Sequence, residues 1–266
     1  MDNNFFQNKI ILINGATGGL GIEISKILSK EGARLILVGT CNDKLKNLIK
    51  TLGNLERHRT IKIDFTNTSD YKIIINKLSH EKKLDIMVNT VALMKCSHLS
   101  DITEDDTINM FNVNIISIIN LVASLLKNNY FSRSCLIVNI GSSFGSLGYP
   151  FYNIYCATKF ALYGFSESLN RELSDTDKKV IYIAPRAINT NLNTDIISNI
   201  NKEMKNTVDS PKKVAEKIIS IMRKNKSLFE SIGCTEKIIL KINSIMPFII
   251  DNFFKKNIGK IKKHLR

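Results

Sequence analysis

Short apolar runs alternate with amphipathic stretches along most of the chain. Runs too short for a helix predict buried strands at residues 9–13, 35–38, 60–64, 84–89, 136–138, 180–184 and 228–232. Apolar residues three or four apart predict helices between them, at about 22–31, 43–52, 69–81, 104–127, from 152 onward and at 210–223. This alternation predicts an α/β fold: a doubly wound parallel sheet of about seven strands.

The length of the chain favours one domain. Its 266 residues, 44% of them hydrophobic, are enough to bury one sizeable core. The alternation fades near the end, where apolar residues at helical spacing lie among many lysines. We therefore expect a single domain over residues 1–233, followed by a basic amphipathic extension over residues 234–266 that is packed on it or appended to it.

Cysteine and histidine usage argues against a metal site. The five cysteines, at positions 41, 96, 135, 156 and 234, form no C-x-x-C pair, and the four histidines are scattered. Such usage fits a reducing compartment. The first nine residues lack the features of a signal peptide, and the apolar run at 115–126 is shorter than the ~20 residues of a membrane span. We expect a cytoplasmic protein, soluble or at most peripheral to a membrane.

The net charge of +14 raises the question of an anionic partner. Nucleic-acid binding calls for clustered Lys and Arg with interleaved aromatic residues, or for a recognisable module. The sequence has neither, and its abundant Ile, Lys and Asn fit a drift toward AT-rich codons. We expect no nucleic-acid partner.

A glycine-rich loop follows the first predicted strand. Residues 14–21 read NGATGGLG and lead directly into a helical apolar pattern. Glycines permit a tight turn there and let backbone N–H groups approach a pyrophosphate at a helix N-terminus. Strand, glycine turn and helix in this order indicate dinucleotide binding.

A second candidate site begins at the strand near residue 137. On the helix that follows, Tyr155 and Lys159 are four residues apart and emerge on one face. A free Tyr has a pKa near ~10, and a neighbouring ammonium group lowers it, which suits proton transfer. Such a pair also occurs by chance on exposed helices. Ser142 and Ser143 end the preceding strand, where open α/β sheets bind ligands.

In this order, the motifs resemble the short-chain dehydrogenase/reductase family in its compact single-domain form, over about residues 9–230. The glycine loop matches the family's T-G-x-x-x-G-x-G with Asn14 in place of Thr, and residues 89–92 match N-N-A-G only in the first residue and in having a small last residue, Ala92. Residues 185–190 match P-G-x-x-x-T with Arg186 in place of Gly. The resemblance implies a Rossmann-like, three-layer fold and an oxidoreductase.

The family's catalytic residues map onto Asn114, Ser142, Tyr155 and Lys159. Ser142 is preferred to Ser143 because it lies thirteen residues before Tyr155. The resemblance implies hydride transfer between nicotinamide and a carbonyl or secondary alcohol, with Tyr155 as general acid and Ser142 bonded to the same substrate oxygen. Lys159 would hold the nicotinamide ribose and lower the pKa of Tyr155, and Asn114 would hold a proton-relay water.

The resemblance also implies a set of cofactor contacts. They are Gly15, Thr17, Gly18, Gly19, Leu20, Gly21, Thr40, Asp64, Phe65, Asn89, Tyr155, Lys159, Pro185, Ile188 and Thr190. NAD enzymes usually place an Asp at the position of Gly39, and NADP enzymes of the family often place an Arg at the position of Thr40 or Gly18. Neither is present, and the missing carboxylate favours NADP(H) over NAD(H).

Two features leave alternatives open. Arg186 lies where substrate and nicotinamide should meet, so it either anchors a phosphate or an anionic substrate, alongside Ser142 and Tyr155, or is an exposed residue in place of a non-essential Gly. The extension could contact an anionic membrane surface, cover the substrate pocket or pack on another subunit.

The leading functional hypothesis is an oxidoreductase acting on an apolar or lipid-like carbonyl or alcohol. An alternative enzyme is a 3-oxoacyl-acyl carrier protein reductase, whose acidic partner would suit a basic surface. The alternative from another class is a nucleotide-binding scaffold without catalysis, which would not need the full catalytic set. Family habit implies a homodimer or homotetramer formed through the helices at 104–127 and 152–173.

Overall fold

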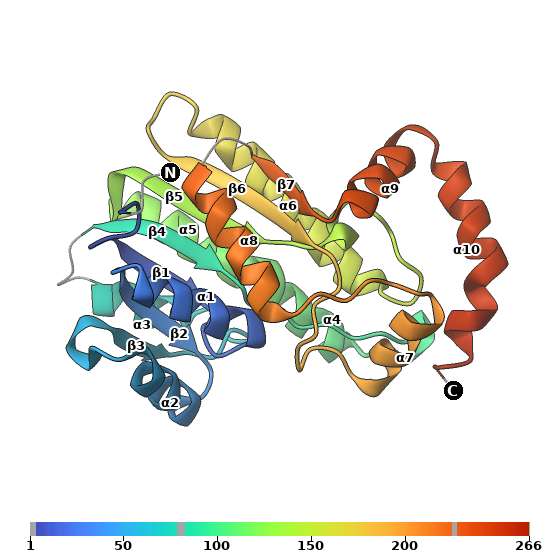
Figure 1. Cartoon of the computed structure of the whole chain (residues 1–266), viewed down its shortest axis with the longest axis horizontal. Coiled ribbons are helices and arrows are strands. Elements are labelled where there is room, and N and C mark those ends of the chain that lie inside the picture. Colours follow the sequence, from blue (N-terminus) through green and yellow to red (C-terminus); the bar gives the residue numbers. More distant parts are fainter. Residues whose placement is uncertain (1–3, 79–82, 225–227, 266) are drawn as a thin grey trace.

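The structure is a computed structural model that describes residues 4–78, 83–224 and 228–265. One parallel sheet of seven strands runs through it, in the order β3-β2-β1-β4-β5-β6-β7 (Figure 1). The strands are β1 (Ile10–Asn14), β2 (Arg34–Gly39), β3 (Arg59–Lys62), β4 (Leu84–Asn89), β5 (Phe131–Ile140), β6 (Lys179–Pro185) and β7 (Phe229–Ile232). The predicted doubly wound fold is confirmed.

Helices cover both faces of the sheet. They are α1 (Gly19–Lys30), α2 (Asn42–Leu52), α3 (Tyr71–Leu78), α4 (Glu104–Phe111), α5 (Ser117–Lys127), α6 (Asn153–Glu172), α7 (Asp195–Glu203), α8 (Pro211–Lys224), α9 (Cys234–Ile245) and α10 (Pro247–Lys262). Apolar residues of α1, α2 and α8 pack on one face, and those of α3, α5 and α6 pack on the other. The result is the expected three-layer arrangement.

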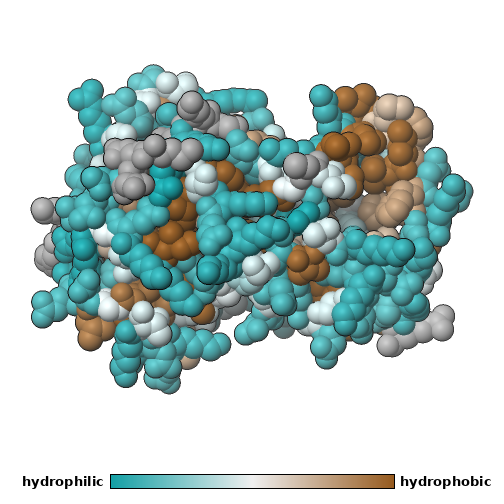
Figure 2. Space-filling model, in the orientation of Figure 1, coloured by the Kyte–Doolittle hydropathy of each residue, from teal (hydrophilic) through white to brown (hydrophobic). Residues whose placement is uncertain are grey.

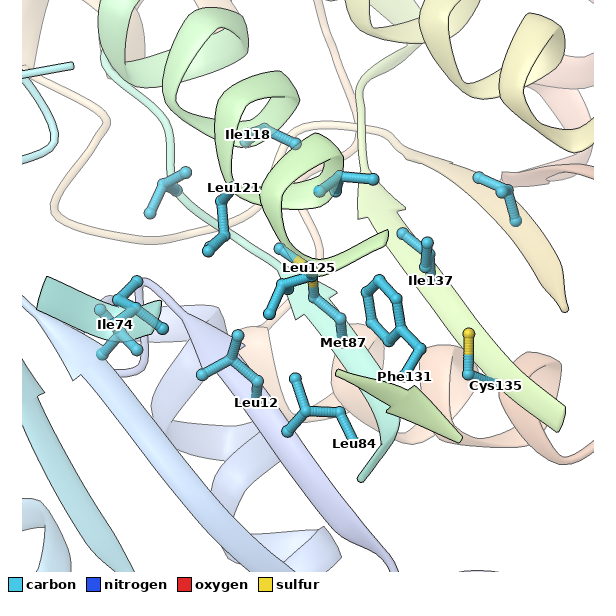
Figure 3. Packing of buried hydrophobic residues seen from close by; sticks show 14 of the residues in the cluster. Leu12, Ile74, Leu84, Met87, Ile118, Leu121, Leu125, Phe131, Cys135 and Ile137 are labelled. Atoms are coloured by element: carbon cyan, nitrogen blue, oxygen red, sulfur yellow. The ribbon is translucent and has the colours of Figure 1, made fainter. Parts of the chain in front are cut away.

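The hydrophobic core has two parts, one on each face of the sheet, because successive side chains along a strand point to opposite faces. Leu12 and Met87 point to the face covered by α5, where Leu121 and Leu125 meet them (Figure 3). Residues one position away, such as Ile13, join the cluster under α1 and α8. Continuous apolar runs in the sequence are therefore what a sheet buried on both faces requires.

Strand β5 begins five residues earlier than its apolar run indicates. Phe131 is paired with Leu84, and the register then shifts before Leu136 pairs with Ile86. The intervening Ser-Arg-Ser stretch is polar and largely exposed, so hydrophobicity alone does not mark it as strand. The predicted end of the helix at 69–81 lies outside the described residues.

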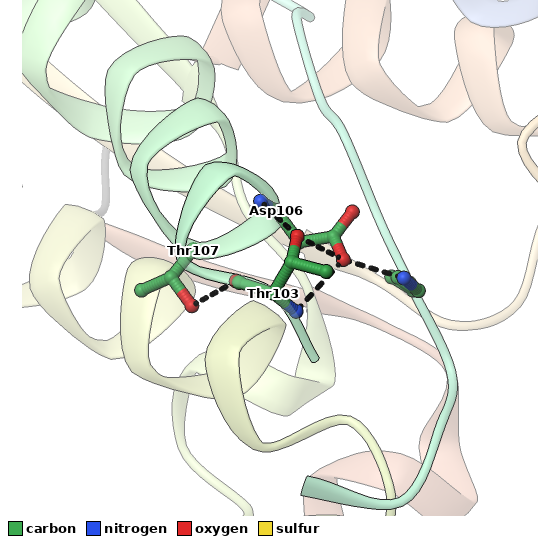
Figure 4. Close-up of polar contacts among 4 residues, drawn as sticks. Thr103, Asp106 and Thr107 are labelled. Atoms are coloured by element: carbon green, nitrogen blue, oxygen red, sulfur yellow. Dashed lines mark hydrogen bonds and ion pairs between the residues drawn. The ribbon is translucent and has the colours of Figure 1, made fainter. Parts of the chain in front are cut away.

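The helix predicted over 104–127 starts at a capping box (Figure 4). The Thr103 hydroxyl accepts a hydrogen bond from the Asp106 N–H at 3.1 Å, and the Asp106 carboxylate accepts one from the Thr103 N–H at 3.1 Å. Lys95 pairs with the same carboxylate. These bonds lower the pKa of Asp106 to about 2, the Lys95 bond being the strongest cause. They join the start of α4 to the loop after β4.

The same helix is interrupted by a π-helical turn at Asn112–Ile116, between α4 and α5. By length and composition Glu104–Lys127 could cross a membrane, but half of its most apolar window is buried inside the protein. Ile118, Leu121 and Leu125 belong to the core beneath it. This segment is therefore a core helix, as expected.

The extension folds back over the carboxyl end of the sheet. After β7, α9 leads to Pro247, where α10 turns toward α7 (Figure 1). Ile261 is fully buried near Ile197 and Ile200 of α7, and the Phe254 ring meets Tyr149 at 4.9 Å. The extension is therefore packed on its own domain, as one of the two arrangements expected for it.

Candidate active site

A cavity of about 860 Å³ lies at the carboxyl ends of the strands. Its wall includes the glycine loop, the end of β6, the start of α6 and both C-terminal helices. Open α/β sheets bind ligands at this edge, and the volume is in the range of small-molecule and cofactor sites. Most predicted site residues lie on this wall.

The glycine loop forms a cradle that side chains would fill. Gly15 has φ of +78°, and a Cβ there would lie 2.7 Å from the Thr90 Oγ1. A Cβ on Gly21 would lie 2.2 Å from the Gly15 carbonyl oxygen, so only glycine lets α1 start this close to the loop. The N-terminus of α1 meets the cavity here, which suits a pyrophosphate.

Thr90, the departure from the family's second Asn, has a clear structural role. Its hydroxyl donates to the Asn14 carbonyl oxygen at 2.7 Å, and its N–H donates to the same oxygen at 2.9 Å. The loop after β4 is thereby tied to the glycine loop after β1. Thr90 therefore holds the two loops together at this position.

Four buried polar side chains cross the sheet just below the cavity. The Asn14 amide donates to Asn89 at 2.7 Å, Asn89 donates to Asn139 at 2.7 Å, and Asn139 donates to Ser166 at 2.8 Å. This asparagine chain holds the ends of β1, β4 and β5 in register and joins them to α6. Asn89 thus lies behind the cavity wall with its side chain in this chain of hydrogen bonds, and its contact with the cofactor stays a prediction.

Ser142, Tyr155 and Lys159 all line the cavity. Ser142 begins a 3₁₀ turn at the end of β5, where its hydroxyl accepts from the Phe144 N–H at 3.1 Å. Tyr155 and Lys159 lie one turn apart on α6, and the Lys159 Nζ is 5.6 Å from the centre of the Tyr155 ring. The Ser142 hydroxyl lies close enough to Tyr155 to lower the pKa of its phenol. The structure thus brings the predicted catalytic hydroxyls together.

Burial dominates the electrostatics of this pair. It raises the pKa of Tyr155 above its ordinary value, an effect that the nearby Ser142 hydroxyl partly opposes. Burial also lowers the pKa of Lys159 to about 8. The Lys159 amine donates to the Ile140 carbonyl oxygen at 3.3 Å. Lys159 is not among the groups that shift the Tyr155 pKa, so the lowering expected from Lys159 is not found.

Tyr182 of β6 supports the turn that carries Ser142. Its hydroxyl accepts from the Ser142 N–H at 3.2 Å and lies 3.2 Å from the Ser142 carbonyl oxygen. The residue is fully buried, and a Cβ on Gly141 would come within 2.0 Å of its ring. Tyr182 is thus a positioning residue, which the sequence shows only as one more apolar position in a strand.

Asn114 lies in the π-helical turn, behind the cavity wall. Its amide group donates to the Leu93 carbonyl oxygen and to the Thr158 Oγ1, both at 2.9 Å, and its Oδ1 accepts from the Leu93 N–H at 2.7 Å. Both amide protons are therefore used within the protein. Asn114 joins α6 to the loop after β4, and its role in holding a relay water stays a prediction.

The nucleotide end of the cavity carries the other predicted contacts. The Asp64 carboxylate accepts from the Thr66 N–H and hydroxyl, at 2.9 and 2.8 Å, and lies on the wall beside Phe65. Thr40 lies there too, together with Lys44 in the first turn of α2. The sequence reasoning missed Lys44, although its place in the helix after the second strand could have indicated it.

Arg186 matches neither of its two predicted roles well. Its guanidinium group makes a bidentate ion pair with the buried Asp209, at 2.8 and 3.0 Å, and lies 3.7 Å from Glu236. Arg186 lowers the pKa of Asp209 to about 2. The alternative of an exposed arginine is wrong, because only 16% of the side chain is exposed. Its charge is already balanced, which weakens the alternative of an anion anchor.

The far end of the cavity is apolar and aromatic. Phe144 stacks on Tyr149 at 4.7 Å, and Tyr149 meets Phe254 of α10. Residues of α9 and α10 complete this wall: Glu236, Ile239, Leu240, Ile249, Ile250, Phe253 and Phe254. The amphipathic pattern of the extension was visible in the sequence, but its location over the cavity was not.

Comparisons with known proteins agree with this geometry. The family described as short chain dehydrogenase matches residues 9–201. An uncharacterized oxidoreductase of Staphylococcus saprophyticus is 29% identical over 83% of this chain and 89% of its own length. A 3-oxoacyl-[acyl-carrier-protein] reductase of Haemophilus influenzae is 27% identical over 74% and 80% of the two chains. A 3-ketodihydrosphingosine reductase of Bacteroides thetaiotaomicron is 29% identical over 69% and 65%.

Solved structures share the fold at lower identity. A short-chain dehydrogenase of Streptomyces avermitilis covers 94% of this chain and 97% of its own, with 21% identity and a TM-score of 0.80. Enzymes of Burkholderia phymatum, in complex with NAD, and Burkholderia cenocepacia, in complex with NADP, have TM-scores of 0.78 and 0.77. They are 17% and 22% identical and cover 90% and 86% of this chain, and 94% and 98% of their own. From its matched length, its fold and its site, the chain belongs to the short-chain dehydrogenase/reductase family of oxidoreductases.

Proposed function

We propose that this oxidoreductase uses NADP(H) and reduces a carbonyl group, or oxidises the matching secondary alcohol, on an apolar molecule, with Tyr155 as the general acid and base. The observation that carries the proposal is the placement of Ser142, Tyr155 and the buried Lys159 on one cavity wall, with Tyr155 and Lys159 one helical turn apart. A nucleotide-binding scaffold would not need this arrangement.

A preference for NADP(H) is supported at the ribose end of the cavity. Gly39 ends β2 without a carboxylate, and a Cβ there would already lie 3.0 Å from the Thr17 Oγ1. Lys44, in the first turn of α2, lines the cavity close by in the chain, and its positive charge favours a phosphate group. Thr40 adds a hydroxyl group to the same wall.

The mechanism follows from the burial of the catalytic pair. The bound nicotinamide would supply or accept the hydride. The hydroxyls of Ser142 and Tyr155 would converge on the substrate oxygen, and Tyr155, protonated at neutral pH because its pKa is raised, would donate its proton in reduction. Lys159 would stabilise the phenolate left behind, and Ser142 would stabilise the developing alkoxide.

An apolar substrate is supported by the far wall of the cavity. Phe144, Leu147, Tyr149 and the apolar residues of α9 and α10 surround the space beyond Tyr155. A second enzyme, 3-oxoacyl-acyl carrier protein reductase, is favoured by one observation, the basic charge of the chain. The two differ in the substrate they use: a free apolar ketone, or an acyl chain on a protein carrier.

One set of measurements tests the proposal. NADPH and NADH binding would be titrated by nicotinamide fluorescence, and turnover followed with a panel of apolar ketones and a 3-oxoacyl carrier protein. Wild type should bind NADPH more tightly and turn over apolar ketones. Tyr155→Phe should lower kcat at least about a thousandfold, the loss of an acid and of its hydrogen bond, with nearly unchanged NADPH affinity.

The matched variant for the cofactor is Lys44→Ala, which should weaken NADPH binding about tenfold, roughly 1.4 kcal/mol, and leave NADH binding unchanged. Lys46→Ala, also exposed on α2, is the control. Undiminished turnover by Tyr155→Phe would sink the catalytic assignment. Nucleotide binding without turnover of any carbonyl would support a scaffold instead.

A further inference from the structure

Exposed apolar side chains gather over the turn between α9 and α10. Figure 2 shows this concentration of hydrophobic surface over the C-terminal helices, beside a hollow. We call it the apolar tip, formed by Ile238, Ile245, Met246, Phe248, Ile249 and Phe253, whose exposures lie between 40 and 68%. Exposed contiguous apolar surface of this kind marks an interaction site.

The apolar tip is continuous with the cavity. Ile249 and Phe253 belong to both, because they line the cavity and are 40 and 48% exposed. Ile250 and Phe254 continue the apolar wall inward, toward Tyr149. A molecule that enters between these helices therefore passes from the tip to the catalytic pair along apolar surface.

Lysines flank the apolar tip on both helices. Lys241 lies between Ile238 and Ile245 on the same face of α9, and all three are exposed. On α10, Lys256 and Lys260 are exposed and continue the face of Ile249 and Phe253, at helical spacings of three and four. The face that carries the tip is therefore both apolar and cationic.

Acidic groups are few on these helices. Residues 234–265 contain seven lysines but only two acidic residues. Glu236 is half-buried and lies 3.7 Å from Arg186, and Asp251 is two positions from Ile249, which puts it about 200° around the helix. Neither offsets the charge beside the tip.

We propose that the apolar tip docks into an anionic membrane surface, so that the cavity opens toward the bilayer and its substrate is a carbonyl-bearing lipid dissolved there. An apolar face flanked by lysines matches acyl chains beneath anionic headgroups. A second copy of the chain is a poorer partner, because a twofold contact through the tip would oppose two lysine-rich rims. The substrate claim rests on the proposed function; the docking claim does not.

Vesicle flotation tests the docking. The full chain would be mixed with vesicles of phosphatidylcholine alone, or of equal parts phosphatidylcholine and phosphatidylglycerol, and floated in a density gradient. We expect binding to the anionic vesicles only, weakened by high salt. The double variant Ile245→Ser/Phe248→Ser and the double variant Lys241→Glu/Lys256→Glu should each lower binding at least tenfold.

Matched controls distinguish binding through the apolar tip from non-specific binding by other exposed apolar or charged residues. Leu55→Ser and Leu99→Ser remove apolar side chains that are 54 and 58% exposed elsewhere. Lys46→Glu/Lys50→Glu removes the same charge from α2. Equal flotation of control and tip variants would overturn the proposal. So would a wild type that does not float, or a tip variant whose only effect is to turn a dimer into a monomer.

The substrate claim has its own readout. Turnover of a short, water-soluble ketone should be unchanged in Ile245→Ser/Phe248→Ser, since neither residue lines the cavity, while turnover of a long-chain ketone in anionic vesicles should fall at least tenfold. Flotation without turnover of any carbonyl would overturn the proposed function and leave the docking intact. Turnover of the soluble ketone without flotation would overturn the docking and leave the proposed function intact.

Discussion

Lys159 shows how a single residue can serve chemistry at the expense of stability. Its side chain is 1% exposed, and burial lowers its pKa to about 8. The ordinary pKa of Lys is about 10.4, so at neutral pH the folded protein holds a charged amine in a place that disfavours the charge. Such a residue persists where function requires it.

We therefore expect Lys159→Met to stabilise the protein at pH 7 while removing activity. The gain should be about 1–3 kcal/mol, because the variant no longer buries a charge. Between pH 8 and about 10.4 the unfolded wild type binds a proton that the folded wild type does not, so wild-type stability rises with pH. The stability gap should shrink over that range.

Urea unfolding of both proteins at pH 7 and pH 10 measures this effect. Lys46→Met, which removes a positive charge at an exposed position, serves as the control and should show no gap at either pH. A gap for Lys159→Met that is equal at the two pH values would mean that burial does not lower this pKa.

Among single residues, those in local motifs could be predicted and those in long-range contacts could not. Tyr155 and Lys159 are four residues apart on one helix, so spacing alone puts them together. Arg186 and Asp209 are paired through a fold that no local pattern reveals. The sequence therefore left the role of Arg186 undecided, and the ion pair with Asp209 gives that role.

At the scale of elements, three sets of polar contacts join the elements that surround the site. The Asn114 amide fixes the loop after β4 to α6, the asparagine chain fixes the strand ends, and Tyr182 fixes the Ser142 backbone. The elements themselves were predictable from apolar periodicity. The polar contacts between them were not, because they join residues tens of positions apart.

We expect Tyr182→Phe to lower kcat at least tenfold without changing NADPH affinity. The hydroxyl bonds the backbone of Ser142 at 3.2 Å, and its loss leaves a buried N–H without a partner and frees the turn to shift. Leaving such a group unpaired costs about 1–3 kcal/mol of folding stability. Steady-state kinetics and nucleotide titration give the required kcat and affinity values.

The control for Tyr182 is its neighbour Tyr163, whose ring is 5.2 Å away and whose pKa is raised by burial and by the nearby Glu167. Tyr163→Phe should leave kcat unchanged. If the two variants behaved alike, or if Tyr182→Phe lost stability but kept its kcat, then Tyr182 would be a packing residue only.

At the scale of the whole molecule, the two ends of the cavity differ in how they are built. The nucleotide end uses the glycine loop and the ends of β2 and β3, each recognisable where it stands in the sequence. The substrate end is assembled from the turn after β5, from α7 and from helices more than eighty residues further along the chain. The substrate end of the cavity is therefore harder to predict from the sequence than the nucleotide end.

This division predicts that α10 can be undocked without loss of the nucleotide site. Ile261 is fully buried near Ile197 and Ile200 of α7, and no cofactor contact predicted here lies on α10. Replacing a buried Ile by Ser removes about 2–5 kcal/mol of packing, enough to open a terminal helix locally before the domain unfolds. Ile261→Ser should therefore speed proteolysis between α9 and α10 and raise the KM for apolar ketones about tenfold, while NADPH affinity stays unchanged.

Ile238→Ser, at a position 61% exposed on α9, is the control and should change neither the proteolysis, nor the KM for a soluble ketone, nor the NADPH affinity. If Ile261→Ser weakened NADPH binding as much as it raised KM, the two ends of the cavity would form one cooperative unit, and the extension would be an integral part of the domain.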